Sequence, residues 1–501
     1  MGRILSIDEG TTGVRGVVVD DHGTFLGSAY REFDQHFPRP GWVEHDAEAI
    51  WEATITACRD ALANATTRPD EIVAVGITNQ RETTVLWDRS SGRPIHNAIV
   101  WQDRRTAAIC DRLTEAGHAD TIRATTGLVV DAYFSGTKIA WTLDAVDGAR
   151  ARAESGDLAF GTMDSWLVWN LTGGAVHATE PSNACRTMLV DLATTDWSPD
   201  MLDLLDVPAA VLPEIRDSSG DFGRTDPDRF LGIDAPISGI AGDQQSALFG
   251  QGCWTPGMSK NTYGTGSFLL MNTGDEPAMS DQGLLTSVGW RIGGRTTYVL
   301  EGAIFVTGAA VQWLRDGLGI IERADDTEAL AREVPPGNEG VYLVPAFTGL
   351  GAPHWDPYAR GTIVGLTRGT GRAHFARAAV EAMAYQSVDV VDLMAAESGQ
   401  EIRELRVDGG ACRNDLLCQF QADVLGAPVV RPTTQETTVL GAAFLAGLGA
   451  GVWSSTDELE GVWNLDRRFE PTMESARREH LLTGWREAVA RSCGWATVVD
   501  G

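Results

Sequence analysis

Short apolar segments alternate with amphipathic segments along the first 250 residues. Apolar, β-branched residues on both sides of a Gly/Thr turn at 10–13 predict two strands, and residues 25–33 predict a third strand beside them. Asp46 precedes apolar residues at helical spacing, which predicts a capped helix over about 46–63. Further buried strands are expected at 72–77 and 83–87, and further helices at about 104–113, 138–146 and 165–171. This alternation predicts an α/β domain.

The same order of elements begins again near residue 237. Residues 237–243 form an apolar run that ends in Gly-Asp, and 262–271 again read as strand, Gly/Thr turn and strand. A third apolar run, at 405–411, again ends in an aspartate followed by glycine, and it precedes a helix expected from about 414 to 425. We therefore expect two related halves with a cleft between them, a first domain over 1–250 and a second over 251–501. Helices over 373–397 and 475–492 would cover the second sheet.

The composition restricts the class of protein. Its 501 residues include 69 acidic and 40 basic side chains, so the formal net charge is −29. With 43% hydrophobic residues the chain is not disordered, and its acidity argues against a nucleic-acid partner. Lys138 and Lys260 are the only lysines, which leaves 40 − 2 = 38 arginines. An acidic, lysine-poor chain suits a solvent in which salt screens charge repulsion, so we expect a halophilic source.

The cysteines and the hydropathy predict a cytoplasmic protein. The seven cysteines are scattered and none are spaced C-x-x-C, so we expect free and mostly buried thiols rather than disulfides or a zinc site. No apolar run approaches the roughly 18 residues that a bilayer requires, so no membrane span is expected.

Two Gly/Thr turns are candidate phosphate-binding sites, at 10–13 and 264–266. Glycine lets phosphate oxygens approach the backbone N–H groups closely, and threonine hydroxyls add donors. Either turn alone is more often an ordinary hairpin, but their recurrence in two similar halves favours phosphate. The chain contains no G-x-x-x-x-G-K-[ST] motif, which excludes a Walker-type site.

Three aspartates end apolar strands, namely Asp8, Asp243 and Asp408. A carboxylate at a strand end in a cleft can hold magnesium or accept a hydroxyl proton. For Asp408, a role in capping a turn or helix is equally well supported.

Arg81 and Glu82 form an adjacent pair of opposite charges after a buried strand. Successive residues of an extended segment point to opposite sides, so the letters alone favour a solvated surface pair. Composition alone likewise places Trp101 in the core.

Long, ordered motifs across the whole chain resemble those of the glycerol kinases. The segments are 8–15 (DEGTTGVR), 40–45 (PGWVEH), 76–84 (GITNQRETT), 98–105 (AIVWQDRR), 133–138 (YFSGTK), 238–245 (SGIAGDQQ), 260–266 (KNTYGTG), 345–361 (PAFTGLGAPHWDPYARG), 407–411 (VDGGA) and 440–443 (LGAA). The resemblance implies an FGGY-type carbohydrate kinase of the actin-like superfamily, in which two ribonuclease H-like α/β domains enclose an active-site cleft. It also implies ATP and Mg²⁺ as cofactors, and it is compatible with a homo-oligomer.

The resemblance assigns roles to individual residues. It implies that the glycerol hydroxyls are bound by Arg81, Glu82, Tyr133, Asp243 and Gln244, with Trp101 and Phe268 on the glycerol carbons. It reverses the surface expectation for Arg81 and Glu82. It implies that the nucleotide is held by Thr11, Thr12, Gly13, Arg15, Thr265, Gly308, Gln312, Gly410 and Asn414, and that Asp8 is associated with magnesium. Asp243 would be the catalytic base.

Two departures from the family pattern stand out. Glu9 occupies a position where the family usually has Gln, so it would add negative charge beside the triphosphate if it pointed into the cleft. Residues 223–234 do not reproduce the loop with which bacterial relatives bind fructose 1,6-bisphosphate.

The expected reaction is the phosphorylation of glycerol by ATP. The alternatives are a kinase for another polyol or ketose, such as erythritol or a ketopentose, and an actin-like filament or chaperone ATPase without a small-alcohol substrate. The acid-arginine pair and Trp101 favour glycerol over a larger polyol, because this small triol leaves room for an aromatic wall over its carbons. Actin-like filament proteins and chaperone ATPases lack a dedicated alcohol-binding acid-arginine pair.

Overall fold

The first half of the chain is built on a five-stranded sheet in the computed structural model, which describes residues 2–496. The strand order is β14 (Ile237–Gly242), β6 (Ile72–Asn79), β1 (Arg3–Glu9), β2 (Gly13–Val19) and β3 (Phe25–Glu32). Strands β1, β2 and β3 are antiparallel neighbours, whereas β6 and β14 run parallel to β1. The three consecutive strands predicted at the start of the chain are therefore confirmed.

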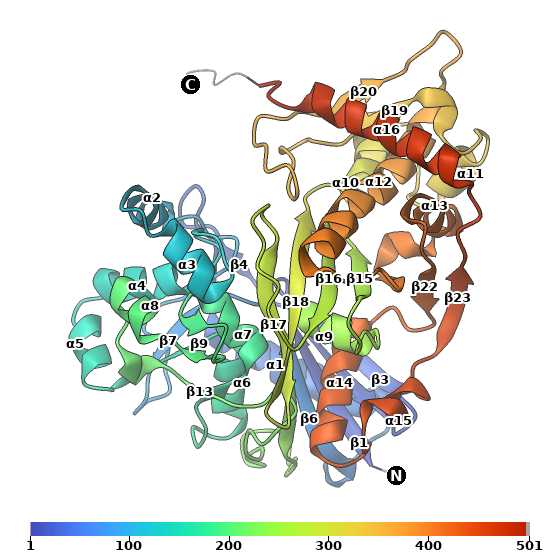
Figure 1. Cartoon of the computed structure of the whole chain (residues 1–501). Coiled ribbons are helices and arrows are strands. Elements are labelled where there is room, and N and C mark those ends of the chain that lie inside the picture. The colour runs from blue at the N-terminus through green and yellow to red at the C-terminus, as the bar shows by residue number, and fades with distance from the viewer. Residues whose placement is uncertain (1, 497–501) are drawn as a thin grey trace.

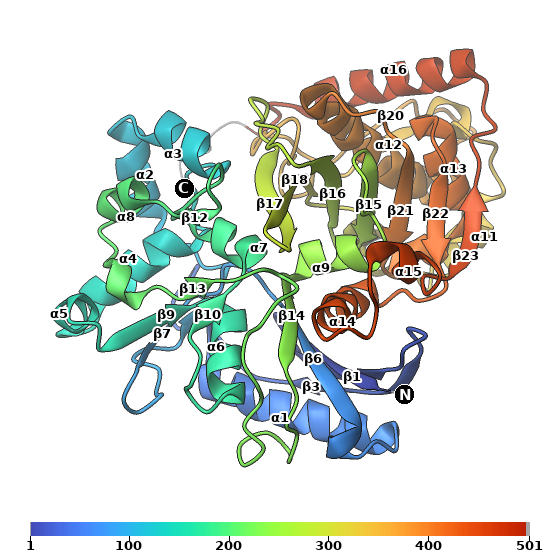
Figure 2. The same ribbon diagram turned by 60° about the horizontal axis from the view of Figure 1, so that its bottom comes forward.

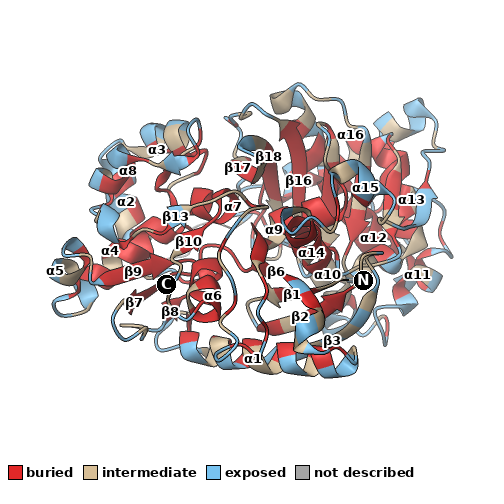
Figure 3. Cartoon of the chain, turned by 90° about the horizontal axis from the view of Figure 1, so that it is seen from below, coloured by how far each residue is buried: buried red, intermediate tan, exposed pale blue. Residues whose placement is uncertain are grey.

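One face of this sheet packs on helix α1 (Ala47–Asn64). The Asp46 carboxylate accepts hydrogen bonds from the backbone N–H groups of Glu48 and Ala49, so the predicted cap is confirmed. Buried residues of the helix, such as Ile50 and Cys58, join the core beneath the sheet, and the outer face of α1 is exposed (Figure 3).

The second half repeats the same sheet. In the order β18 (Arg295–Ile304), β16 (Ser267–Gly274), β15 (Met258–Tyr263), β21 (Glu404–Asp408) and β22 (Val429–Pro432), the first three strands are antiparallel and the last two are parallel to β15. Strands β17 (Leu285–Ile292) and β23 (Leu465–Phe469) extend the two edges. Figure 2 shows the two sheets side by side. The weak sequence repeat thus corresponds to one topology that occurs twice.

The helices predicted for the second half are confirmed within one or two residues. They are α12 (Arg372–Ser398), α13 (Asp415–Leu425) and α16 (Ser475–Ser492). Asn414 caps α13, because its side-chain oxygen accepts from the Leu417 backbone N–H at 3.0 Å.

Two helices lie between the sheets, α9 (Asp243–Gly250) and α14 (Thr437–Gly449) (Figure 1). Although α14 belongs to the second half, it packs on β1, β6 and β14 of the first sheet. A Cβ on Gly441 would lie only 1.9 Å from the Ser246 carbonyl oxygen, so glycine is required where the two helices meet. Apolar residues from both halves, including Ile4, Leu248 and Phe444, therefore share one core cluster.

The segment between β6 and β14 carries a cluster of short elements beside the first sheet. Strand β7 (Val85–Asp88) and helices α2 (Ala107–Glu115), α4 (Ser135–Ala145) and α6 (Met163–Leu171) lie within about three residues of their expected positions, whereas α3 (Ala119–Thr126) and α5 (Ala149–Glu154) were not foreseen. All seven cysteines are free and six of them are buried, as expected. None of the helices within residues 2–496 is long and apolar enough to cross a membrane.

Candidate active site

A small cavity of about 60 Å³ is lined by residues from both halves of the chain. The structure brings all seven residues of the expected glycerol set to this cavity, together with Thr11: Arg81, Glu82, Trp101, Tyr133, Asp243, Gln244 and Phe268. Six of the seven come from the first half of the chain, and Phe268 on β16 comes from the second. Residues up to 268 − 11 = 257 positions apart in sequence, from Thr11 to Phe268, therefore line the same cavity.

The backbone at Glu82 explains why the surface expectation for the acid-arginine pair was wrong. Glu82 has a φ of 62°, and the Thr83 N–H donates to the Arg81 carbonyl at 2.8 Å. In this tight turn the two successive side chains point to one side rather than to opposite sides. Arg81 and Glu82 are only 3% and 1% exposed. A left-handed conformation is costly for a residue with a side chain and is typical of functional sites.

Two further charged residues complete the site, and sequence reasoning missed both. Glu301 on β18 accepts from the Arg81 guanidinium at 2.6 and 3.0 Å, and Arg186 donates to Glu82 at 2.6 Å. Burial alone would raise the pKa of Glu301, but the guanidiniums of Arg186 and Arg81 outweigh it and lower the pKa to about 2. Buried charges of this kind must be paired to be tolerated. No local pattern in the sequence marks Arg186 or Glu301.

An aromatic wall closes one side of the cavity. The Trp101 indole N–H donates to the Thr11 hydroxyl at 2.9 Å, and the Trp101 and Tyr133 rings meet edge to face at 5.6 Å. Trp101 is therefore only partly buried at the cavity, not in the core as its composition class suggested. Such rings provide an apolar surface for the carbon chain of a polyol.

Asp243 is the first residue of α9 and lies at the mouth of the cavity. Its Oδ1 accepts from the Gln244 backbone N–H at 2.7 Å and lies 3.2 Å from Arg81 Nε. Its Oδ2 accepts from the Gln244 side-chain amide at 3.3 Å. The carboxylate is thus held in one orientation while about a third of its side chain stays exposed.

Asp8 and the first Gly/Thr turn form the adjoining wall. Asp8 and Arg15 are directly opposite each other on β1 and β2. Arg15 also pairs with Glu436 at 2.8 Å, and Thr12 shares a hydrogen bond with the Tyr30 hydroxyl at 3.0 Å. Burial raises the pKa of Asp8 to about 7, Arg15 opposes this rise, and the negative charges of Asp243 and Glu436 add to it.

A cation beside Asp8 would relieve this accumulation of negative charge. The described residues contain no cluster of three or more His, Cys, Asp or Glu side chains arranged for a metal ion. Mg²⁺ does not need one, because it usually takes one or two protein carboxylates and fills its other positions with phosphate oxygens and water. Asp8 therefore fits a magnesium ion that arrives with a nucleotide.

Glu9 points away from the cleft. It lies on the opposite face of β1 from Asp8, where its Oε1 accepts from the Gln80 amide at 2.8 Å. The side chain is fully buried, and burial raises its pKa well above the usual range, with the nearby charges of Asp8 and Asp243 adding to the rise. Because the carboxyl group is buried against Gln80, this departure from the family pattern does not place a carboxylate in the cleft.

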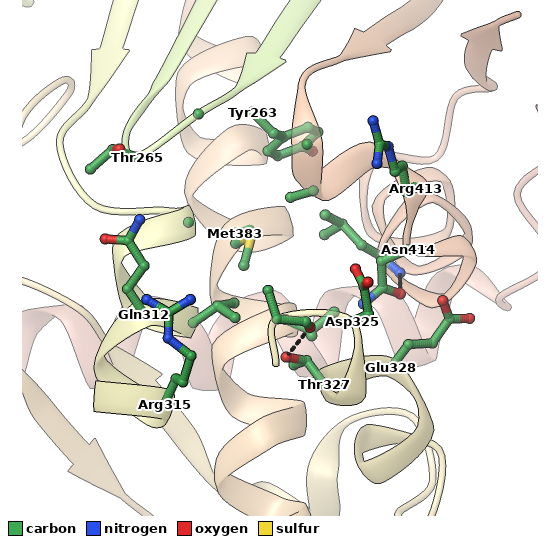
Figure 4. Close-up of a pocket in the computed structure, with 18 residues that line it drawn as sticks. Tyr263, Thr265, Gln312, Arg315, Asp325, Thr327, Glu328, Met383, Arg413 and Asn414 are labelled. Atoms are coloured by element: carbon green, nitrogen blue, oxygen red, sulfur yellow. Dashed lines mark hydrogen bonds between the residues drawn. The ribbon is translucent and has the colours of Figure 1, made fainter. Parts of the chain in front are cut away.

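A second, larger pocket of about 480 Å³ lies in the second half (Figure 4). It contains five residues of the expected nucleotide set, namely Thr265, Gly308, Gln312, Gly410 and Asn414. The remaining four, Thr11, Thr12, Gly13 and Arg15, lie on the first Gly/Thr turn and its following strand and do not line this pocket.

Gly410 leaves open space in this pocket, and charged side chains are part of its lining. A Cβ added to Gly410 would meet no atom within 4 Å, so the space in front of this residue is open. Gln312 and Arg315 lie across the pocket from Arg413 and Asn414 in Figure 4, and the two arginines were not foreseen. Val380 and Met383 of α12 supply apolar lining, which suits a flat base.

A cavity of about 950 Å³ connects the two sites along the cleft. It shares Gly264 and Thr265 with the large pocket, and Trp101, Tyr133, Gln244 and Phe268 with the small one. A ligand that extends from one pocket to the other would therefore pass the second Gly/Thr turn.

Asp408 is held by two side-chain donors and caps neither a turn nor a helix in the way the sequence suggested. Its Oδ2 accepts from the Gln251 amide at 2.7 Å and from the hydroxyl of Thr437, the first residue of α14, at 2.6 Å. The side chain is buried and lines none of these three cavities.

Comparisons with known proteins agree with this architecture. Residues 3–250 match the model for the N-terminal domain of the FGGY family of carbohydrate kinases, and residues 259–450 match the model for its C-terminal domain. The chain is 60% identical to the glycerol kinase of Dechloromonas aromatica over 98% of both chains, and 57% identical to glycerol kinase 2 of Thermotoga maritima over 99% of both.

Solved structures show the same fold. The crystal structure of Plasmodium falciparum glycerol kinase with ADP superposes with a TM-score of 0.93 at 34% identity, covering 98% of both chains. A xylulose kinase from Lactobacillus acidophilus, at 23% identity, has a TM-score of 0.88 over 99% of both chains. The predicted class, α/β with two ribonuclease H-like domains, is confirmed by this likeness and by the repeated sheet. The chain belongs to the FGGY family of carbohydrate kinases.

Proposed function

We propose that this chain transfers the γ-phosphoryl group of ATP to a primary hydroxyl of glycerol, giving sn-glycerol 3-phosphate and ADP. The small cavity carries the proposal. A water-sized group needs about 10–15 Å³ of such space, so about 60 Å³ holds roughly four to six groups. Glycerol, with three carbons and three oxygens, matches that size, whereas a ketopentose has ten such atoms. Relatives named as glycerol kinases support the same substrate.

The polar residues of the cavity suit a triol. Arg81 donates hydrogen bonds and Glu82 accepts them, so the pair recognises hydroxyl groups from two sides. Tyr133 and Gln244 add further polar contacts, and Trp101 and Phe268 cover the carbon chain.

Asp243 is the proposed proton acceptor. As the substrate oxygen forms its bond to the γ-phosphorus, the bond from phosphorus to the bridging oxygen of ADP breaks, and the hydroxyl proton passes to the Asp243 carboxylate. General-base assistance of this kind is worth roughly 100- to 10,000-fold. Arg15 and the two Gly/Thr turns would donate hydrogen bonds to the charged phosphoryl oxygens, which supplies much of the remaining catalysis.

The large pocket is the proposed nucleotide site. Thr265, Gly308, Gln312, Gly410 and Asn414 would hold the base and ribose end, and Thr11, Thr12, Gly13 and Arg15 would meet the phosphates from the opposite half. A relative whose structure contains ADP supports this use. Mg²⁺ bound at Asp8 would neutralise phosphate charge.

Glycerol dependence is the decisive test. We expect ADP release to require glycerol, and to be much slower with erythritol or xylulose because they exceed the cavity. Faster turnover with either larger substrate would favour another polyol or ketose kinase. ATP hydrolysis at full rate without any alcohol would instead indicate an actin-like or chaperone ATPase.

The two proposed binding functions belong to different halves of the chain. We infer a first domain over 1–250 that binds glycerol and a second over 251–501 that binds the nucleotide, with closure of the cleft excluding water from the reaction. Limited proteolysis with and without both substrates would report the closure. Because the reaction consumes ATP, we place it in the cytoplasm. A homo-oligomer is our expectation, which light scattering would check.

The charge of −29 supports a salt-rich working solvent. At 1 M salt the Debye length falls to about 3 Å, so repulsion between exposed carboxylates is largely screened. We infer a halophilic source and expect activity and folding to require molar salt. Full activity and stability in dilute buffer would refute this inference without touching the kinase assignment.

A further inference from the structure

Both lysines of this chain are buried beside the proposed active site. The chain has 40 basic Lys and Arg residues, of which only Lys138 and Lys260 are lysines, and both side chains are 0% exposed. Every exposed guanidinium or ammonium group of the described chain is therefore an arginine. Lysine occurs only at two buried positions, although arginine serves everywhere else. This distribution suggests that each buried position has a specific requirement for an ammonium group.

Lys260 lies on β15, in the second half, and contacts a residue of the first. Its Nζ donates to Gln244 Oε1 at 2.5 Å and to the Thr262 hydroxyl at 2.9 Å. The ammonium group has donors and no acceptor, so the oxygen of the Gln244 amide must face it. The NH₂ end of that amide is then directed to Asp243, where it donates to Oδ2 at 3.3 Å.

Without the lysine, the orientation of the Gln244 amide would depend on its longer contact with Asp243 alone. An amide presents a donor at one end and an acceptor at the other, and a rotation by 180° would turn its oxygen toward the Asp243 carboxylate. That orientation would set two oxygen acceptors against each other and remove a donor from Asp243. Lys260 and Asp243 therefore favour the same orientation of the Gln244 amide, and the contact with Lys260, at 2.5 Å, is the shorter of the two.

The same ammonium group is tied to the second Gly/Thr turn. Thr262 is on β15, which ends at Tyr263 and leads directly into the turn. Gly264 and Thr265 of that turn line both the proposed nucleotide pocket and the connecting cavity. One nitrogen atom thus links α9, which carries Asp243, to the strand that carries the turn.

We propose that Lys260 is a positioning residue for phosphoryl transfer, which holds the Gln244 amide in the orientation that donates to Asp243 and keeps that carboxylate in register with the second Gly/Thr turn. This inference rests on the proposed function. Lys260 lines none of the three cavities, so it acts through Gln244 and not by touching a substrate. Arginine does not replace it, because a planar guanidinium on a longer stem cannot put a single nitrogen between these two oxygens.

Lys138 provides the matched control. It is also a fully buried ammonium near the cavity, but it donates to the backbone carbonyls of Tyr133 and Phe134 and makes no contact with Gln244. A loss of activity that comes only from removing a buried charge should therefore occur equally in Lys138→Met and Lys260→Met.

A double-mutant cycle with Gln244→Met tests the proposal. Misplacement of a reacting group by about 1 Å can cost on the order of 100-fold, and we expect Lys260→Met to lower kcat by about 10- to 100-fold with the KM for ATP nearly unchanged. In the Gln244→Met background, Lys260→Met should lower kcat by less than about twofold, because the amide it orients is gone. Lys138→Met should lower activity by the same factor in both backgrounds.

An NMR measurement that does not depend on activity tests the contact between Lys260 and Gln244. With only two lysines, isotope-labelled lysine gives two ε-methylene signals in the NMR spectrum, which Lys138→Arg and Lys260→Arg assign. Gln244→Met should shift the signal of Lys260 and leave that of Lys138 in place. If Lys260→Met fails to fold, the cycle is run with Lys260→Arg, which keeps a cation on the strand and for which the same non-additivity is expected.

Two results would overturn the proposal. One is an unchanged kcat in the Lys260 variant, and the other is a loss that multiplies fully with that of Gln244→Met. Failure of the proposed function is distinct, because the unaltered chain would then release no ADP in response to glycerol.

Discussion

The two halves carry sheets with the same order and direction of five strands, but they differ at the turn between the first two strands. In the first half the turn at 10–13 lies between Asp8 and Arg15, and it adjoins the cavity of about 60 Å³ lined by Arg81, Glu82 and Asp243. In the second half the turn at 264–266 lies between Tyr263 and Ser267, and it adjoins the open pocket of about 480 Å³.

The difference shows what a repeated topology supplies. Both sheets deliver a glycine-rich turn to the same cleft, where its N–H groups can meet phosphate. The side chains around each turn differ, and we propose that this difference gives the two halves different tasks. Charged groups surround a small cavity for an alcohol in the first half, whereas the second half has an open, partly apolar pocket for a nucleotide. Variants that alter only one of the two proposed binding sites would test whether their tasks are separate.

The largest effect is expected at Asp243. We predict that Asp243→Asn lowers kcat by roughly 100- to 10,000-fold and leaves ATP binding, measured by calorimetry, nearly intact. The amide cannot accept the hydroxyl proton, although it keeps the shape of the carboxylate. Asp408→Asn is the control, because that aspartate holds Gln251 and Thr437 and should affect folding stability far more than kcat. Near-normal turnover of Asp243→Asn would refute its assignment as the base.

The next effect is expected at Glu301, which belongs to the second half and pairs with Arg81 of the proposed glycerol site. Glu301→Gln should raise the KM for glycerol by about 10- to 100-fold, because a hydrogen bond to a charged group is worth about 1.5–3 kcal/mol and Arg81 loses its carboxylate partner. The KM for ATP should change little.

Glu381→Gln is the matched control for Glu301→Gln. It removes an equally buried carboxylate, paired with Arg377 at 2.6 Å, but at a position remote from the glycerol cavity. Its KM for glycerol should match that of the unaltered chain. An equal rise in both variants would show that Glu301 acts only through general stability.

A smaller effect is expected in the nucleotide pocket. Gly410→Val should raise the KM for ATP by about tenfold, or about 1.4 kcal/mol, because the new side chain occupies open space in the pocket. The KM for glycerol and the unfolding temperature should stay nearly constant. Gly409→Val is the contrast, since Gly409 has a φ of 84° and its Cβ would lie 2.3 Å from the Tyr263 carbonyl oxygen. It should destabilise the fold instead.

The smallest effect concerns acid stability. The pKa of Glu301 is about 2 in the folded chain, because Arg186 and Arg81 outweigh the effect of burial, compared with an ordinary value of 4.5. The folded state binds this proton less readily, so the ion pairs stabilise the fold above pH 4.5 and lose that contribution as the pH falls toward 2. Unfolding temperatures of the unaltered chain and Glu301→Gln should therefore differ by a constant amount above about pH 5 and converge as the pH falls from 4.5 toward 2. Parallel curves would contradict the pairing.

Much of the fold was accessible to sequence reasoning because its signals are local. The helix at Ala47–Asn64 has its cap one residue earlier, its apolar positions at helical spacing, and a strand signal on either side. The two Gly/Thr turns are likewise recognisable from a few adjacent residues. Sequence reasoning placed these elements within a few residues, and the motif resemblance named the residues that meet in the small cavity.

The charged partners of the site needed the tertiary structure. Arg81 meets Glu301 across 220 positions, and Arg186 meets Glu82 across 104, so no spacing along the chain records either pair. The left-handed turn at Glu82 likewise depends on its surroundings, because nothing in the adjacent letters compensates for its strain.

The sequence by itself therefore determined most of the elements, the repeated α/β plan and the two Gly/Thr turns, since periodicity, caps and glycine act over a few residues. Only the tertiary structure decided how each acid is used. It places Asp243 at the small cavity, near enough to Asp8 for their charges to interact, and it uses Asp408 to hold Gln251 and Thr437. It also buries the Glu9 side chain against Gln80. A carboxylate takes its role from the donors and charges packed around it, and those come from distant parts of the chain.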